Sequence, residues 1–289
     1  MRLLLSLVMA AALLAPQAAP PSERPVFKGG VDRVRVDALV TDGERPVMGL
    51  TAKDFRVWDN GVPQSPDLLE SGGPVKVLLV LDISTSVAGV RLEHLRMASG
   101  RLLDALNEDD MVGLLTFSER IDQLVPLTRR HDEVRDALTR VHAGGRTALY
   151  DAVFTGLALG TGESGRWLVL VFSDGADTAS WLAGDRVLAE AGRSSLVVYG
   201  VTAEGRARDA RPWLDGITAA TGGRVTDAAG SEDVGRVFVD LLNEYRSRYL
   251  LAFTPTGQGG EGWHTLKVRT QGSAAAAKVV ARKGYFATR

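Results

Sequence analysis

The sequence predicts an α/β protein whose central domain is a doubly wound, mostly parallel sheet, flanked by a small β module built from both ends of the chain. Between residues 74 and 247, short apolar runs alternate with segments of helical periodicity. That alternation is typical of a mostly parallel sheet with helices on both faces. Before and after this region, apolar and polar residues alternate with a period of two, which predicts half-buried strands.

The composition is that of a globular protein and excludes several functional classes. The chain has 289 residues, of which 45% are apolar and 24% charged, so an ordinary buried core is expected. The formal net charge is −1, without the concentrated basic face of a nucleic-acid-binding protein. The absence of cysteine excludes disulfides, thiolate metal sites, cysteine nucleophiles and a lipoprotein anchor.

Residues 1–19 have the pattern of a secretory signal peptide. Arg2 is followed by an apolar run from Leu3 to Leu14 and then by the small residues Ala18 and Ala19. The run is shorter than the roughly 20 residues that a membrane span needs. An uncleaved N-terminal anchor is the alternative. We therefore expect an exported protein, periplasmic or extracellular, with no membrane span once the signal is removed.

Residues 20–73 are expected to form an N-terminal β segment and a linker. Apolar residues alternate with polar ones from Val34 to Val40, which predicts a half-buried strand. A second alternating segment, Phe55–Val57, runs into Asp59-Asn60-Gly61, a strong hairpin-turn signal. The N-terminal segment therefore predicts short antiparallel strands.

Residues 74–247 are expected to contain the alternating strands and helices in chain order. The predicted strands are Val77–Leu81, Met111–Phe117, Ile121–Val125, Trp167–Phe172 and Leu196–Val201. The predicted helices are Leu92–Leu106, His131–His142, Leu149–Leu157, Leu182–Ala191, Pro212–Ala220 and Val234–Tyr245. The connection between the second and third strands is too short for a crossover, so these two strands are expected to form an antiparallel hairpin.

Residues 248–289 return to the period-two pattern. Strands are expected at Tyr249–Phe253, at His264–Val268 and at Lys278–Arg282. Three short strands are only marginally stable by themselves. We therefore expect this C-terminal segment to pair with the strands of residues 31–70 and complete one β module.

Oxygen-bearing side chains follow the buried strands of the central domain. Asp82, Ser84 and Ser86 come directly after the first strand, Thr147 lies in a Gly-Gly-Arg-Thr loop, and Asp174 lies in a Ser-Asp-Gly segment after a later strand. Ligands of open parallel sheets bind just beyond the carboxyl ends of the strands. These side chains are therefore expected to converge at one end of the sheet.

The chemistry of this set favours a hard divalent cation. Carboxylate and hydroxyl oxygens suit Mg²⁺, Mn²⁺ or Ca²⁺ better than zinc or copper. A site with so few direct negative ligands is expected to be weak and to keep an open coordination position. The alternative is structural, because Ser and Asp are ordinary N-cap residues and residues 82–86 alone also fit a capped helix start.

The motifs resemble those of the von Willebrand factor type A domain over about residues 74–246. The Asp-x-Ser-x-Ser segment at 82–86, Thr147 and the Ser-Asp-Gly segment at 173–175 resemble that family's metal-ion-dependent adhesion site, in the expected order. The flanks resemble a secreted bacterial subgroup, with VTDGERPVMGLTAKDFRVWDNGVPQ before the domain and YRSRYLL and ARKGYF after it.

The resemblance implies a Rossmann-like fold and metal-bridged adhesion to a protein partner. By similarity, the hydroxyls of Ser84, Ser86 and Thr147 would bind Mg²⁺, or Mn²⁺ or Ca²⁺, directly. Asp82 and Asp174 would act largely through water. An Asp or Glu carboxylate of the partner would then complete the coordination of the cation.

Residues beside the motifs carry further expectations. Integrin-type domains have extra acidic residues after the second serine, whereas this chain has Val87–Gly89, so a second, adjacent cation site is not expected. We interpret Asp177 as a solvated loop carboxylate rather than a water-mediated ligand. Arg146 is either a charge that steers an acidic partner or a simple rim charge. We interpret Trp181 as the first core residue of the next helix rather than a contact aromatic.

Two other functional classes are alternatives to an adhesion module. In a Mg²⁺-dependent phosphatase or other hydrolase, Asp82 would be the nucleophile, but Ser84 stands where many such phosphatases have a second acid. The sequence has no Gly-x-Ser-x-Gly elbow, zinc signature or phosphate-binding Gly-Lys-Ser loop. In a scaffold, the metal would only stiffen the loops. The histidines have no ligand spacing, so we interpret them as surface or capping residues: His94, His131, His142 and His264. We expect a binding module and no enzyme.

Overall fold

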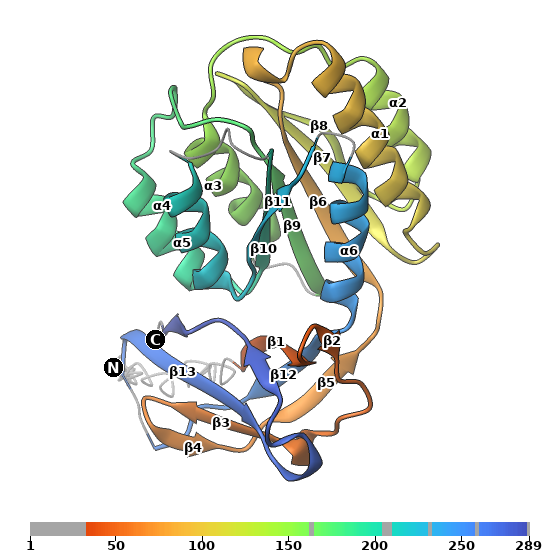
Figure 1. Cartoon of the computed structure of the whole chain (residues 1–289). Helices are drawn as coiled ribbons and strands as arrows, with labels where there is room; N and C mark the ends of the chain where they lie inside the picture. Colours follow the sequence, from red (N-terminus) through yellow and green to blue (C-terminus); the bar gives the residue numbers. More distant parts are fainter. Residues whose placement is uncertain (1–32, 162–164, 204–209, 231–232, 258–259, 288–289) are drawn as a thin grey trace, which may run out of the picture. The chain divides into compact units, whose positions relative to one another are not determined.

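The computed structural model describes residues 33–161, 165–203, 210–230, 233–257 and 260–287. The signal pattern of residues 1–19 lies outside the described residues. Within these ranges, no helix is both long enough and apolar enough to cross a bilayer. Figure 1 shows helices packed around one sheet, together with strands that come from both ends of the chain.

A six-stranded sheet forms the centre of the α/β part, in the order β11-β10-β9-β6-β7-β8. Its strands are β6 (Val75–Asp82), β7 (Met111–Phe117), β8 (Ile121–Thr128), β9 (Arg166–Phe172), β10 (Val197–Ala203) and β11 (Val225–Ala228). Neighbouring strands are parallel, except that β7 and β8 form the predicted antiparallel hairpin. The α/β class predicted from the alternating pattern is therefore confirmed.

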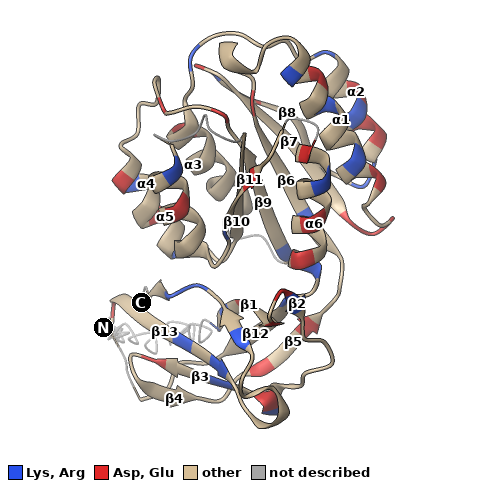
Figure 2. Ribbon diagram, in the orientation of Figure 1, with Lys and Arg blue, Asp and Glu red and all other residues tan. Residues whose placement is uncertain are grey.

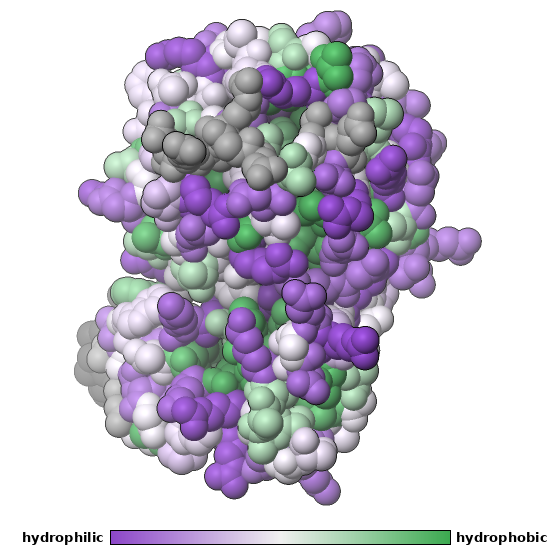
Figure 3. Space-filling model, in the orientation of Figure 1, coloured by the Kyte–Doolittle hydropathy of each residue, from purple (hydrophilic) through white to green (hydrophobic). Residues whose placement is uncertain are grey.

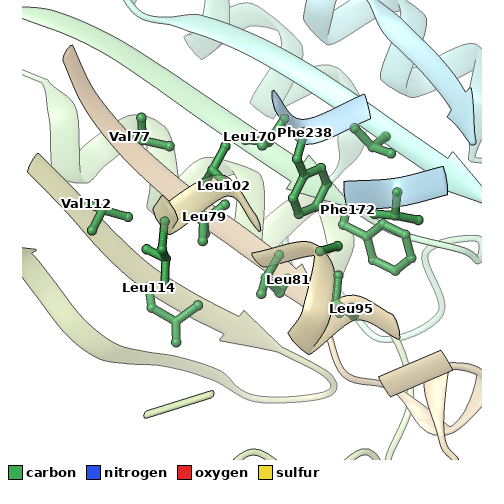
Figure 4. Packing of buried hydrophobic residues seen from close by; sticks show 14 of the residues in the cluster. Val77, Leu79, Leu81, Leu95, Leu102, Val112, Leu114, Leu170, Phe172 and Phe238 are labelled. Carbon is green, nitrogen blue, oxygen red and sulfur yellow. The ribbon is translucent and has the colours of Figure 1, made fainter. Parts of the chain in front are cut away.

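Helices cover both faces of this sheet (Figure 1). One apolar core contains residues of α1 (Val90–Asp104), α2 (His131–Thr139) and α6 (Val234–Arg246), and the other contains residues of α3 (Leu149–Gly160), α4 (Gly184–Arg193) and α5 (Arg211–Thr221). Alternate residues of β6 enter opposite cores, because successive side chains of a strand point to opposite faces. Figure 4 shows the first core, where Leu79 of β6 packs with Leu102 of α1 and Phe238 of α6.

Strands from the two ends of the chain pair with each other in two antiparallel sheets. In the first, β1 (Val34–Asp42) lies between β14 (Lys278–Val280) and β12 (Tyr249–Phe253), with β5 (Asp67–Ser71) beside β12 and β2 (Arg45–Pro46) beside β1. The second has the order β15-β13-β3-β4, from β15 (Gly284–Ala287), β13 (Gly262–Thr270), β3 (Phe55–Asp59) and β4 (Val62–Gln64). We refer to these two sheets together as the β module. The predicted turn between β3 and β4 is present, and Asn60 and Gly61 have the positive φ angles, 47° and 83°, that a tight hairpin requires.

The core of the β module is contributed by both chain ends. Val36 and Phe55 from the N-terminal strands share one apolar cluster with Tyr249 and Phe253 from β12. The Tyr249 hydroxyl also donates a hydrogen bond to the carbonyl of Val47 at 2.8 Å, although the two residues lie 202 positions apart in the sequence. Because a few short strands do not stay folded alone in water, each half of the module depends on the other for its buried surface.

Buried arginines join the β module to the α/β part. Arg248, which precedes β12, is fully buried and donates to the carbonyl of Gly222 at 2.6 Å and to the hydroxyl of Tyr199 at 3.0 Å. Arg282, which follows β14, donates to the carbonyl of Ser194 at 3.0 Å. Hydrogen bonds to carbonyl and hydroxyl acceptors offset part of the cost of burying a guanidinium, although Nε of Arg282 has no partner, so these contacts stabilise the packing of the two parts.

Asp37 of β1 is the acidic residue of this buried region. Its Oδ1 lies 3.9 Å from Nε of Arg166, and neither atom has a hydrogen-bond partner. Burial raises the pKa of the Asp37 carboxyl, and this effect outweighs the attraction of Arg166 and the other nearby guanidiniums. This group could not be predicted from local patterns, because the buried charges come from segments far apart in the chain.

Candidate functional site

The carboxyl ends of β6 and β9 lie side by side at the candidate site. Leu81 of β6 is paired with Phe172 of β9, so the residues that follow them, Asp82 and Ser173, lie next to each other at the end of the sheet. The hydroxyl of Ser173 donates to Oδ2 of Asp82 at 2.7 Å. Ser173 belongs to the Ser-Asp-Gly segment, and its hydrogen bond fixes one carboxylate oxygen of Asp82, a role that the motif alone does not predict.

The segment after β6 turns its hydroxyl groups toward Asp174. The backbone N–H of Ser84 donates to Oδ1 of Asp82 at 2.8 Å, the hydroxyls of Ser84 and Ser86 lie 3.1 Å apart, and that of Ser86 donates to Oδ1 of Asp174. Ser84 begins the short 3₁₀ helix η2 (Thr85–Val87) without a capping hydrogen bond from its side chain. The alternative of a side-chain-capped helix start therefore does not describe this segment.

Thr147 enters the same place from the loop before α3. Its side chain is buried, and its backbone N–H donates to the hydroxyl of Thr178 at 3.0 Å. The loop contacts the segment after β6 through the N–H of Gly144, which donates to the carbonyl of Ile83 at 2.8 Å. A Cβ on Gly175 would lie 3.9 Å from Oγ1 of Thr147, so the glycine leaves the space beside that hydroxyl open. The structure thus brings all five predicted residues to one end of the sheet.

The electrostatics of the group fit a cation. Asp174 is buried, and its Oδ2 has no hydrogen-bond partner; Nη1 of Arg91 forms a long ion pair with it at 4.0 Å. Burial raises the pKa of Asp82 to about 6, and repulsion from Asp174 adds to that effect. A buried carboxylate oxygen without a partner, close to a second carboxylate, is the arrangement that a divalent cation would stabilise.

The donor set also limits which cations suit the site. In the described ranges, no group of three or more His, Cys, Asp or Glu side chains is placed to hold a metal ion. The oxygens available here are the hydroxyls of Ser84, Ser86 and Thr147 and the carboxylates of Asp82 and Asp174. Such hard, mostly neutral donors fit Mg²⁺ or a similar ion and do not fit soft metals. Their role as ligands stays a prediction.

Asp177 and Arg146 border the site. Oδ1 of Asp177 accepts hydrogen bonds from the N–H of Tyr150 at 3.2 Å and from the hydroxyl of Ser180, so this carboxylate binds the first turn of α3. The expectation of a merely solvated carboxylate is therefore wrong. Arg146 is exposed at the rim, and its Nη1 lies 3.4 Å from the carbonyl of Thr178.

The prediction that Trp181 is a core residue is wrong. Its side chain is 95% exposed. The backbone N–H groups of Trp181 and Leu182 both donate to the carboxylate of Asp151, and α4 begins only at Gly184. These hydrogen bonds hold the segment before α4 in a conformation that directs the indole away from the core.

The interpretation of His264 as a surface or capping residue is also wrong. It is buried in the β module, with Nδ1 2.8 Å from Oδ1 of Asp59. The hydroxyl of Tyr285 donates to the other oxygen of Asp59 at 2.8 Å. Three chain segments thus meet in one buried polar group, which residue spacing along the chain does not reveal.

Part of the chain is similar to known proteins. Residues 77–176 match the family model of the von Willebrand factor type A domain. A stretch of 91 residues, 30% of the chain, is 29% identical to inter-alpha-trypsin inhibitor heavy chain H3 of Mesocricetus auratus. The findings support a von Willebrand factor type A domain in this chain. The match spans only 10% of the length of that relative.

Solved structures of type A domains share the fold. A von Willebrand factor type A protein from Catenulispora acidiphila has a TM-score of 0.56 and 13% identity, over 86% of this chain and 75% of that chain. The vWF domain of the type V pili tip protein Mfa5 from Porphyromonas gingivalis has a TM-score of 0.51 and 10% identity, over 65% of this chain and 98% of that chain. At such identities the likeness shows the fold alone.

Proposed function

We propose that the type A domain is a metal-ion-dependent protein-binding module of the adhesion type. In this proposal Asp82, Ser84, Ser86, Thr147 and Asp174 hold one divalent cation, Mg²⁺ or alternatively Mn²⁺ or Ca²⁺. The observation that carries it is the buried Oδ2 of Asp174, which has no hydrogen-bond partner and lies among hydroxyl groups and a second carboxylate. A cation there would satisfy the oxygen and relieve the repulsion between the two acids.

The residues of the site leave a bound cation short of negative charge. Both oxygens of Asp82 accept hydrogen bonds, from the N–H of Ser84 and the hydroxyl of Ser173, so part of that charge is used within the protein. The hydroxyls of Ser86 and Thr147 are neutral donors. When bound, the cation would supply an open coordination position to an outside carboxylate. A protein partner that presents an Asp or Glu would therefore add the most favourable ligand to the bound cation.

The groups around Asp82 and Asp174 fit an adhesion module better than they fit an enzyme. In the described part of the site, hydroxyls, backbone N–H groups and the guanidinium of Arg91 surround the two aspartates. None of these surrounding groups acts as a general base at neutral pH. A scaffold with a purely structural metal would not depend on a partner carboxylate, and binding experiments separate the two.

We also propose that the protein is exported and that its segments are arranged as the sequence predicts. Residues 1–19 would be the signal peptide, 20–73 the N-terminal β segment with its linker, 74–247 the type A domain and 248–289 the C-terminal β segment. The antiparallel pairing of β1 with β12 and β14 supports joining the second and fourth segments in one β module. Export to the periplasm or beyond would suit an adhesion module.

Calorimetric titration with Mn²⁺ tests the cation site. Thr147→Ala should weaken Mn²⁺ binding by about tenfold or more, because it removes a donor hydroxyl without adding charge. Thr155→Ala is the matched control, since the Thr155 hydroxyl donates to the carbonyl of Asp151 inside α3 at 2.8 Å. Equal Mn²⁺ affinity of the wild type and Thr147→Ala would show that the site is misassigned.

Protein capture tests the adhesive role. The immobilised full chain is incubated with cell-envelope extract in Mg²⁺ or in EDTA, and the captured proteins are compared. We expect a partner that is lost in EDTA and on Thr147→Ala but kept by Thr155→Ala. A partner whose binding ignores both EDTA and Thr147→Ala would contradict the proposal.

A further inference from the structure

Trp181 is the most exposed large apolar side chain of the described residues, at 95% exposure. The next most exposed, Val90, reaches 69%. On the face drawn in Figure 3, hydrophobic residues form small islands among hydrophilic ones. A fully exposed indole gains more from being covered by a partner than any smaller side chain, because it buries the largest apolar area.

The backbone that carries Trp181 is fixed in place. Its N–H donates to Oδ2 of Asp151 at 2.8 Å, and the N–H of Leu182 donates to Oδ1 of the same carboxylate at 2.9 Å. The hydroxyl of Ser180 donates to Asp177, which also binds the first turn of α3. An exposed side chain on an ordered backbone loses little conformational entropy when a partner covers it.

The same segment borders the candidate cation site. The N–H groups of Thr178 and Ala179 donate to the carbonyl of Thr147 at 2.8 and 3.0 Å. Trp181 follows Thr178 by three residues, in the connection from β9 to α4 that also carries Asp174. The segment that carries the indole therefore contacts the loop of Thr147 through its backbone and is continuous in the chain with Asp174.

The charges of this surface favour an acidic partner. Arg91 and Arg146 stand beside the site, with Nη1 of Arg91 4.0 Å from Asp174 and Nη1 of Arg146 3.4 Å from the carbonyl of Thr178. The nearby carboxylates of Asp151 and Asp177 already accept backbone N–H groups of the first turn of α3 and of the Trp181 segment. Figure 2 shows that residues of both signs occur along α1, α2 and α6.

We propose that Trp181 is the apolar contact of the recognition surface centred on the cation site. The partner is a protein segment with an acidic residue, which reaches the site between Arg91 and Arg146, and with an apolar side chain a few residues away, which covers the indole. This inference rests on the proposed function, because the acidic residue is placed by the cation. Trp181 then determines which acidic segments bind, whereas the cation site determines that the segment must contain an acidic residue.

A random peptide library displayed on phage provides the probe. The full chain is immobilised with Mn²⁺, and bound phage are released with EDTA. We expect the selected peptides to share an Asp or Glu with an apolar residue nearby. Synthetic copies should bind Trp181→Ala at least about tenfold more weakly than the wild type, because buried tryptophans are frequent hot spots of interfaces.

Matched variants separate recognition from folding. Trp181→Phe should recover most of the affinity, and Met97→Ala, which removes an exposed apolar side chain of α1, should bind like the wild type. The melting temperature of Trp181→Ala should be unchanged, because the side chain is exposed. Replacing the apolar residue of the peptide by alanine should abolish the difference between the wild type and Trp181→Ala, as expected for two groups in contact.

The outcomes distinguish this inference from the function on which it rests. Peptides that need Mn²⁺ and Thr147 but bind Trp181→Ala normally would overturn the role of Trp181 and leave the cation site intact. Peptides that ignore EDTA and Thr147→Ala would overturn the proposed function. A selection that yields no EDTA-released peptide would overturn both.

Discussion

Replacing Asp174 with asparagine should have opposite effects on stability with and without a divalent cation. In EDTA the wild type keeps a buried carboxylate whose Oδ2 has no hydrogen-bond partner and whose charge repels Asp82. A buried polar atom without a partner costs about 1–3 kcal/mol. Part of that cost is offset by the ion pair with Arg91 at 4.0 Å. We therefore expect Asp174→Asn to raise the free energy of unfolding in EDTA by about 1 kcal/mol.

With a divalent cation the order should reverse. A ligand at one hundred times its Kd stabilises the folded state by about 2.7 kcal/mol, provided that it does not bind the unfolded chain. For a chain of this size each kcal/mol corresponds to about 2–4 °C in melting temperature, so the wild type should gain roughly 5–10 °C. Asp174→Asn lacks the carboxylate and should gain little. The variant is then the less stable protein.

Thermal unfolding of the full chain in EDTA and in millimolar Mn²⁺ measures both effects. Asp177→Asn is the control from the same loop. It perturbs the carboxylate that binds the N–H of Tyr150 and the hydroxyl of Ser180, so it should lower stability in both buffers and keep the Mn²⁺ shift. An equal Mn²⁺ shift in the wild type and in Asp174→Asn would refute the reasoning.

Three further predictions follow from other charges and strands. Arg91→Gln should raise Mn²⁺ affinity severalfold in calorimetry, because it removes a positive charge 4.0 Å from Asp174; unchanged affinity would contradict this. Because the pKa of Asp37 is raised in the folded state, its contribution to stability is complete below pH 3.8 and is lost as the pH rises through the folded-state pKa. In urea titrations, the unfolding free energy of the wild type relative to Asp37→Asn should therefore fall over that pH window. A difference that stays constant with pH would contradict this prediction. Deleting residues 248–289 should expose residues 33–71 to limited proteolysis, because β1, β3 and β5 lose their partners, and undiminished protection would show that they fold alone.

The alternating elements of the α/β part could be predicted because each carries its own local pattern. Apolar runs such as Val77–Leu81 are long enough to mark a buried strand, and they lie inside the strands observed. β11 was missed because its sequence, Val-Thr-Asp-Ala, has no apolar run and it lies at the edge of the sheet, where burial is partial. An edge strand is defined by its neighbour, β10, more than by its own composition.

The convergence of the site residues could be predicted for a similar reason. The carboxyl ends of neighbouring parallel strands meet at one edge, so Asp82 and Asp174 had to lie close if β6 and β9 were adjacent. The direction of Trp181 could not be predicted. Its apolar type favours burial, but hydrogen bonds from its segment to Asp151 decide where the side chain points. Local composition does not encode such contacts between distant segments.

The flanking motifs acquire a physical meaning from the arginines they contain. Arg248 lies in the YRSRYLL segment and Arg282 in the ARKGYF segment, and both side chains are buried against carbonyls of the α/β part. Arg166 of β9 in turn donates to the carbonyl of Arg248 at 3.1 Å and lies near the buried carboxylate of Asp37. Removing the β module would take away both of these partners of Arg166. The stability of the type A domain and of the β module is therefore coupled, which is why binding and unfolding are best measured on the full chain.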